Sequence, residues 1–363
     1  MTEMATRDYS LIGPDGRRAA ESGLATAEWY RTDVPRKQMK ELMQRRDGPA
    51  IRDTLLWIAL FAAFGYGGFY FWGTWWCVPF FLCYGVLYGS SSDSRWHECG
   101  HGTAFKTRWL NDVVYHVASF MIMREPVIWS WSHTRHHTNT IMVGRDPEIV
   151  ATRPPKLFEI FLYFFGITTV PKALLKFAIH ATGKLTEDEK TFVPESEWNK
   201  VYVTARIFLL IHAIPPLLAL YLGSWLPLMY FGVLPSMYGA WMGVYFGLTQ
   251  HAGLAEDVLD HRLNSRTVYM NPIFRFVYWN MNYHIEHHIF PMVPYHALPR
   301  LHEVMGPDLP KPYASTIAAY RDIITALVRQ LKDPNWTIKP ELPGTAKPYQ
   351  ASLPADAVPA PAE

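Results

Sequence analysis

The sequence is poor in cysteine. Of its 363 residues only Cys77, Cys83 and Cys99 are cysteines, and they form no Cys-x-x-Cys pair. We therefore expect neither a disulfide framework nor a thiolate-bound metal or iron–sulfur cluster. The formal net charge is only +2, so we also expect no nucleic-acid partner, which would require a clustered basic face.

Charged side chains are absent from two long stretches, Thr54 to Ser92 and Ile207 to Ala255. A membrane-spanning helix needs about 20 apolar residues, so each stretch is long enough to cross a bilayer twice. Gly73-Thr74 and residues 223–227 lie near the two midpoints, next to tryptophans that favour the membrane interface. The sequence predicts an all-α membrane protein with four transmembrane helices, arranged as two hairpins.

The basic residues predict the orientation of these hairpins. Six of them precede the first span: Arg36, Lys37, Lys40, Arg45, Arg46 and Arg52. The two hairpin tips, in contrast, carry no charge. The positive-inside rule then places both termini and the segment between the hairpins in the cytoplasm. The first fifty residues are polar and show no secretory signal. We expect a multi-pass protein of a bacterial inner membrane.

These observations divide the chain into segments. We expect a cytosolic N-terminal segment (1–50), hairpins at 51–92 and 201–250, a cytosolic helical cap formed by 93–200 and 251–333, and a disordered tail (334–363) where proline and alanine dominate. The apolar run from Ile160 to Pro171 is too short to span a membrane. We interpret it as an interfacial segment, with a buried core helix as the alternative.

Most of the fifteen histidines fall into three short clusters, all on the predicted cytosolic side (His97 and His101; His133, His136 and His137; His284, His287 and His288). On a helix, residues i and i+4 lie on one face and can reach one ion, whereas the i+3 residue points aside and can bind a second ion. Eight imidazoles are too many for one tetrahedral zinc. They predict a dinuclear metal site, although imidazole alone does not select among Zn, Fe, Cu and Ni.

A ninth candidate ligand is His251, at the cytosolic end of the last predicted span. The alternative is an interfacial histidine bonded to a backbone carbonyl. Metal-bound imidazoles usually donate their other N–H to a carboxylate or carbonyl. Candidates near the clusters are Glu98, Glu286 and Asp146. Asn280 is a candidate for holding a metal-bound water, with a turn or cap role as the alternative.

The spacing His-x-x-x-His, His-x-x-His-His and His-x-x-His-His resembles that of the integral-membrane fatty acid desaturase and hydroxylase superfamily. The run from Asn282 to Pro291 is similar to the last motif of acyl-lipid desaturases. Within the superfamily the chain looks most like bacterial desaturase-like hydrocarbon oxygenases of the rhizopine-catabolism oxygenase type. Residues 250–254 are similar to an element of membrane alkane hydroxylases.

The resemblance implies two iron ions and O2 as co-substrate, with nine ligands: His97, His101, His133, His136, His137, His251, His284, His287 and His288. It implies oxidation of unactivated C–H bonds in a fatty-acyl, lipid or hydrocarbon-like substrate, and we favour hydroxylation slightly over the alternative, desaturation. No haem-binding His-Pro-Gly-Gly element is present. A separate electron donor, ferredoxin or a similar protein with its reductase, is therefore expected.

A metal-binding or transport protein is the remote alternative. It would require ionisable residues within the spans. The two predicted spanning stretches contain none except His212 and the terminal His251.

Overall fold

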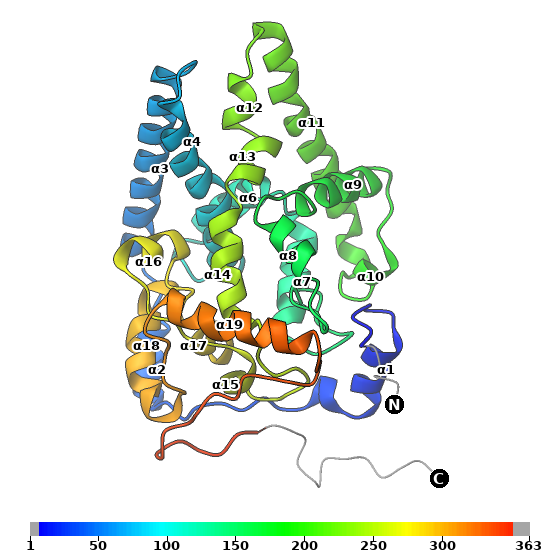
Figure 1. Ribbon diagram of the computed structural model, residues 1–363, viewed down its shortest axis with the longest axis vertical. Helices are drawn as coiled ribbons and strands as arrows, with labels where there is room; N and C mark the ends of the chain where they lie inside the picture. Colours follow the sequence, from blue (N-terminus) through cyan, green and yellow to red (C-terminus); the bar gives the residue numbers. More distant parts are fainter. Residues whose placement is uncertain (1–6, 351–363) are drawn as a thin grey trace.

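The computed structural model describes residues 7–350, which form helices and no β-strand. The predicted all-α class is confirmed. Two isolated bridges, Thr267 with Tyr283 and Val268 with Tyr313, are the β-type contacts in the described residues. Two helical arms project in the same direction from a broad layer of shorter helices, and the described ends of the chain lie on the opposite side of that layer (Figure 1).

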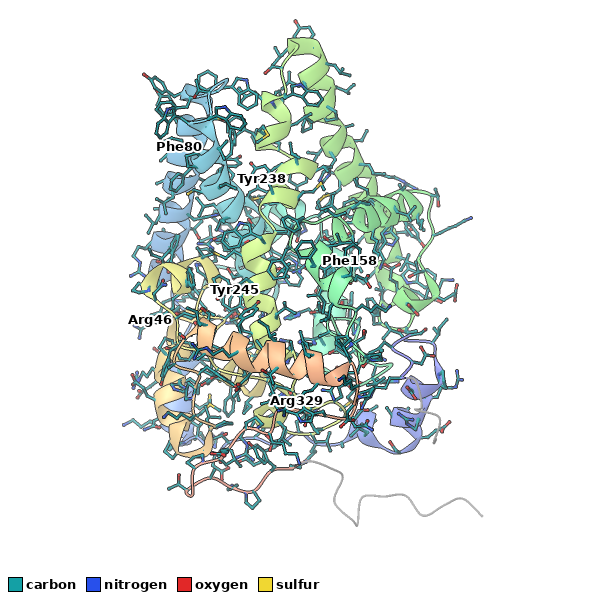
Figure 2. All side chains as sticks on the ribbon, viewed as in Figure 1. Arg46, Phe80, Phe158, Tyr238, Tyr245 and Arg329 are labelled. Atoms are coloured by element: carbon teal, nitrogen blue, oxygen red, sulfur yellow. The ribbon has the colours of Figure 1, made fainter. Side chains whose placement is uncertain are left out.

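The first arm is a helical hairpin made by α3 (Asp47–Tyr70) and α4 (Cys77–Gly85). It turns where the sequence predicted, at Gly73, whose φ of 85° suits glycine. The two helices pack closely at Gly67. A Cβ at this position would lie 2.1 Å from the ring of Phe80, which Figure 2 labels. α4 continues through a π-helical turn (Val86–Ser90) into α5 (Ser91–Gly100), which carries the first histidine cluster.

The second arm has one long helix and a broken return. α11 (Trp198–Leu222) ends at Gly223, and the chain returns as α12 (Leu226–Tyr230), α13 (Val233–Tyr238) and α14 (Trp241–His251). The first break is at Gly232, where φ is 79° and ψ is −131°, a backbone conformation open essentially to glycine alone. Tyr88 of the first arm accepts a hydrogen bond from the Gly232 N–H at 3.0 Å.

In the described residues one helix, Glu195–Leu222, is long and apolar enough to cross a membrane by length and composition. The four predicted transmembrane helices are therefore not confirmed. α4 and the three pieces of the return are short as separate α-helices, and α3 is rich in glycine and aromatic residues. Charge-free stretches in the sequence did not reveal these interruptions.

The two arms meet at glycines just above the histidine layer. A Cβ on Gly89 would lie 2.7 Å from the backbone of Gly239. Ser90 donates to the Gly239 carbonyl at 2.6 Å and accepts from the Gly243 N–H at 2.7 Å. The π-helical turn therefore lies where the two arms meet. Turns of this kind are frequent at functional sites. This turn brings α5 and α14 together.

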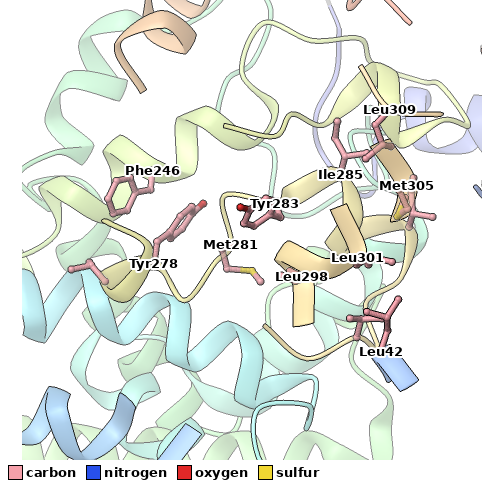
Figure 3. Packing of buried hydrophobic residues seen from close by; sticks show 13 residues of the cluster. Leu42, Phe246, Tyr278, Met281, Tyr283, Ile285, Leu298, Leu301, Met305 and Leu309 are labelled. Carbon is pink, nitrogen blue, oxygen red and sulfur yellow. The ribbon is translucent and has the colours of Figure 1, made fainter. Parts of the chain in front are cut away.

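Short helices form the cap around this crossing: α1 (Pro14–Glu21), α2 (Arg36–Leu42), α6 (Arg108–Met121), α7 (Pro126–Thr138), α10 (Glu187–Lys190), α15 (His261–Asn264), α16 (Pro272–Tyr278), α17 (His284–Ile289), α18 (Leu298–Met305) and α19 (Thr316–Gln330). Phe246, Tyr278, Ile285 and Leu301 are buried together and join α14, α16, α17 and α18 (Figure 3). This core fixes α17, which carries the third cluster.

The apolar run from Ile160 to Pro171 is split between α8 (Leu157–Tyr163) and α9 (Thr169–Ala181). Gly166, with a φ of 64°, lies in the turn between them. Ile160 is buried, whereas Phe158 and Phe161 are exposed. The interfacial position of this segment stays a prediction.

Residues 334–350 differ from the disordered tail predicted by their composition. They are extended but bonded to the cap: the Ile338 N–H donates to Gly253 O at 2.9 Å, and the Arg262 side chain donates to the carbonyls of Lys347 and Pro348. Backbone hydrogen bonds of this kind do not depend on side-chain composition, which explains the difference. The rest of the predicted tail, 351–363, lies outside the described residues.

Candidate metal centre

Four helices direct histidines to one place beneath the arms, and all nine predicted ligands meet there. They form two adjacent groups, and within each group the candidate ligand atoms lie within 4.8 Å of one another. The five-histidine group consists of His97, His101, His133, His137 and His287; the four-histidine group consists of His136, His251, His284 and His288.

The helical spacing of the clusters explains this division. On α7, His133 and His137 share one face and enter the five-histidine group, while His136 points to the other group. On α17 the roles are reversed, because His284 and His288 enter the four-histidine group and His287 crosses to the five-histidine group. Each i+3 histidine thus serves the neighbouring group, as its position in the cluster predicted.

The imidazoles point their Nε2 atoms at one another. The Nε2 atoms of His97 and His287 are 2.7 Å apart, those of His101 and His133 3.1 Å, and those of His251 and His284 3.0 Å. Burial, and then the repulsion of neighbouring imidazoles, places the pKa of His97, His137 and His284 well below the ordinary value. These histidines are neutral, which is the form that binds metal ions.

The opposite ring atoms, Nδ1, explain why Nε2 is free to point inward. Asp146 accepts from His136 Nδ1 at 2.8 Å, Glu148 contacts His133 Nδ1 at 3.1 Å, and the Asn264 carbonyl accepts from His251 Nδ1 at 2.7 Å. A proton held on Nδ1 leaves the Nε2 lone pair available. The donor set therefore fits two transition-metal ions with imidazole ligands.

The carboxylate of Glu148, which holds the ring of His133, is charged. Burial disfavours the charged form of Glu148, but the histidines beside it and Arg124 outweigh burial and lower its pKa to about 2. Burial likewise disfavours the charged form of His136, but Asp146 outweighs it and raises the pKa of His136. Asp146 also accepts from the Ile141 N–H at 2.7 Å, so its position is fixed by the backbone.

The sequence profile of the fatty acid desaturase family matches residues 73–320, which contain all three clusters and His251. The chain belongs to the fatty acid desaturase family. Over 225 residues it is 23% identical to an sn-1 acyl-lipid omega-3 desaturase (ferredoxin) of a Nostoc species, covering 58% of this chain and 62% of that protein. The match therefore spans less than two thirds of this relative.

Two further relatives carry similar names. An endoplasmic-reticulum omega-3 fatty acid desaturase of Nicotiana tabacum is 23% identical over 60% of this chain and 62% of that protein. An sn-1 oleoyl-lipid 12-desaturase of a Synechocystis species is 26% identical over 31% of this chain and 32% of its own length. Enzymes of the desaturase family are membrane-associated, depend on two iron ions and use O2. The nine histidines of this desaturase-family chain offer the donor set that such a pair of ions requires.

The predicted supporting residues have different outcomes. Asp146 bonds to His136 as expected. Glu98 lies 3.8 Å from His287 Nδ1 and is bonded to Thr103 and to the Tyr295 N–H. Burial raises the pKa of Glu98 to about 8.

Glu286 does not contact the histidine groups, and the contacts of Asn280 match the turn role that was its alternative. The Glu286 carboxylate accepts from Thr267 at 2.6 Å and contacts His302, because on α17 it points away from the histidine face. The Asn280 side chain donates to the Tyr295 carbonyl at 3.0 Å and accepts from Arg275, so it stabilises a turn. Neither side chain contacts a histidine of the two groups among the described contacts.

Sequence reasoning missed Glu148, the Asn264 carbonyl and His261. Glu148 follows Asp146 by two residues, so the same search for nearby acids would have found it. The Asn264 carbonyl could not be predicted, because every residue has a backbone carbonyl and the residue type does not show which one will accept a hydrogen bond. His261 belongs to none of the three clusters and to neither group, but it is buried, and its ring centroid lies 4.9 Å from that of His288. No cluster spacing pointed to it.

Proposed function

We propose that this chain is a membrane fatty-acyl desaturase that introduces a double bond into an acyl chain. In the balanced reaction, two adjacent CH2 groups, O2, two electrons and two protons give a CH=CH unit and two water molecules. The observation that carries the proposal is the meeting of nine imidazoles in two adjacent groups. Two iron ions held by these groups would supply the activation of O2 needed to break unactivated C–H bonds.

The protein's own residues hold and shield this centre. The nine histidines, oriented by Asp146, Glu148 and the Asn264 carbonyl, fix the ligand positions. His97, His133, His136, His284, His287 and His288 are all buried. Burial keeps bulk water from the reacting centre, which protects a reactive oxidant from side reactions.

The arms support a lipid substrate and a bilayer environment. Their surfaces expose large apolar side chains, including Leu55, Phe69, Leu217 and Leu220, and tryptophans at the tips such as Trp75. We infer two membrane-inserted hairpins, with the centre and both termini on the cytoplasmic side of a bacterial inner membrane. The described chain ends lie away from the arms, in keeping with this topology (Figure 1).

The comparisons favour desaturation over the hydroxylation that the sequence led us to prefer. The relatives are named as acyl-lipid and fatty acid desaturases. The likeness to rhizopine-type oxygenases rests on sequence resemblance alone. Hydroxylation and desaturation share the first hydrogen abstraction, so product analysis distinguishes them directly.

The test is to express the full chain in an iron-replete bacterial host, measure metal content after detergent purification, and analyse cellular fatty acids by mass spectrometry. We expect about two irons per chain, as for a dinuclear non-haem centre, and new double bonds that require O2. A His136→Ala/His287→Ala variant should lose both. Hydroxylated acyl chains without double bonds would refute desaturation, and stoichiometric zinc with no O2-dependent product after iron reconstitution would refute the oxidative function altogether.

A further inference from the structure

An aromatic stack connects the surface of the cap to the histidine groups. Trp29, in the segment between α1 and α2, is half-buried and lies flat on His261, with ring centroids 4.2 Å apart and planes 5° apart. His261 is buried, and its ring centroid lies 4.9 Å from that of His288 in the four-histidine group. Two ring contacts therefore separate a surface tryptophan from a candidate metal ligand.

A second connection leads from the same tryptophan to the other group. The Trp29 indole N–H donates to the Thr138 carbonyl at 3.2 Å, and Thr138 follows His137 directly in the chain. The rings of His137 and His288 are themselves 4.5 Å apart. Trp29 is thus joined to the five-histidine group through one hydrogen bond and one peptide unit, and to the four-histidine group through stacked rings.

The segment that carries Trp29 is firmly attached to the cap. The Tyr30 N–H donates to Leu259 O at 2.8 Å, and the Arg262 guanidinium lies 3.6 Å from the centroid of the Tyr30 ring. Arg262 is itself fixed by ion pairs of 2.8 Å to Asp260 and 2.9 Å to Asp308. These contacts hold Trp29 in place, as a fixed route would require.

The surface around Trp29 carries basic side chains. Arg31 is exposed, two residues along the chain from Trp29. Arg135 donates to the Arg145 carbonyl, and Arg145 donates to Asn139, the residue after Thr138. Glu28 is an exposed acid in this stretch, whereas Asp33 is paired with Lys347. Arg31 beside Trp29, and the half-buried Arg135 and Arg145 close to Thr138 in the chain, offer positive charge to an acidic partner.

We propose that Trp29 marks the docking site of an acidic one-electron carrier, a reduced iron–sulfur protein, and that Trp29 and His261 form the path along which its electrons reach the metal centre. This inference rests on the proposed function, in which each double bond consumes two electrons from outside the chain. Two carrier molecules each lose one electron, and the centre gains both. Trp29 and His261 are neither oxidised nor reduced, because they provide only electronic coupling through close-packed atoms.

The test measures reduction of the iron-loaded full chain in detergent without O2 or substrate, with a reduced plant-type [2Fe–2S] ferredoxin as the probe. Stopped-flow absorbance of the ferredoxin follows its oxidation, and each rate is normalised to bound iron. For Trp29→Leu we expect the limiting rate at saturating ferredoxin to fall severalfold, while reduction by dithionite, a small reductant that needs no docking site, stays unchanged. Trp29→Phe, which keeps a ring on His261, should restore most of the rate.

Two matched controls separate the route from general damage. Trp336 is likewise half-buried and lies beneath Arg329 on another part of the cap, so Trp336→Leu should leave the ferredoxin-driven rate unchanged. Arg31→Glu should raise the ferredoxin concentration needed for half the limiting rate and weaken its salt dependence, whereas Arg321→Glu, at an exposed position on α19, should not.

Equal limiting rates for Trp29→Leu and the unaltered chain would overturn the path, and so would an equal slowing with dithionite, since that indicates structural damage. An unaltered chain that dithionite reduces but ferredoxin does not would overturn the acidic carrier. These failures are distinct from failure of the proposed function, because the latter appears as absent double bonds in the unaltered chain whatever Trp29 does.

Discussion

The two histidine groups differ in ligand number and in how firmly the protein orients their rings. In the four-histidine group, His136 and His251 make Nδ1 contacts of 2.8 and 2.7 Å, to Asp146 and to the Asn264 carbonyl. In the five-histidine group the Glu148 contact is 3.1 Å. The buried Nδ1 atoms of His137 and His287 make no hydrogen bond within the described residues, whereas in the four-histidine group this holds for His284 alone. One group thus has few, well-oriented ligands, and the other has more ligands with less support.

The largest effect should come from removing a ligand from the smaller group. His284→Ala leaves three imidazoles there, whereas His101→Ala leaves four in the five-histidine group. We expect His284→Ala to lose about one of the two irons, because a three-imidazole set holds the ion less tightly than a four-imidazole set. Double-bond formation should be lost as well. Metal analysis and fatty acid analysis of the two variants measure the difference.

His116→Ala is the matched control for both variants. His116 is exposed on α6 and contacts the Asp112 carbonyl of its own helix, so its loss should leave iron content and activity unchanged. Greater iron loss in His101→Ala than in His284→Ala would show that ligand number does not decide which group is weaker.

The second comparison concerns the two orienting acids. In the unaltered protein His136 Nδ1 donates to the Asp146 carboxylate, which can only accept. The amide of Asp146→Asn can also donate an N–H to Nδ1, so the ring is no longer held in one tautomer. We expect iron affinity at the four-histidine group to fall by about 10- to 100-fold, the usual cost of removing such a partner. Glu148→Gln should cost less, because four other histidines remain in its group. Titration of the iron-free variants with Fe2+ under anaerobic conditions gives both affinities, and equal losses would contradict the difference in support.

The sequence predicted how the histidines divide between the two groups better than it predicted the contacts that orient them. The spacing within α7 and α17 determines which histidine faces which group, because helical geometry follows from the sequence numbers alone. Glu286 has a similar position beside a cluster, yet it points toward Thr267 and His302. The Asn264 carbonyl and the Gly232 break depend on backbone conformation set by packing between distant segments, and no local pattern reports it.

Acid should expose a difference between His136 and the buried histidines around it. Burial holds the pKa of His97, His101 and His287 well below the ordinary 6.5 in the folded protein. Below about pH 6.5 the unfolded chain therefore binds more protons than the folded chain, and the stability present above this pH is lost. We expect the unfolding temperature of the iron-free protein to fall as the pH decreases through this range.

His136 should oppose this trend, because Asp146 raises its pKa and the folded state retains its proton. Asp146→Asn should accordingly steepen the loss of stability in acid, whereas His116→Ala should follow the unaltered protein. Unfolding temperatures measured across a pH series in detergent test both statements. A profile that does not change with pH would mean that the buried imidazoles are not neutral in the folded, iron-free protein.

The smallest effect should follow from Glu98→Gln. Glu98 lies beside the five-histidine group, but its carboxylate is 3.8 Å from His287 Nδ1, beyond hydrogen-bond reach. Because burial raises its pKa to about 8, Glu98 is largely protonated at neutral pH, and glutamine resembles that neutral form. The amide oxygen can still accept from Thr103 and from the Tyr295 N–H. We therefore expect iron content and desaturation close to those of the unaltered protein. A loss of iron affinity as large as that of Asp146→Asn would show that Glu98 orients His287 directly once metal is bound.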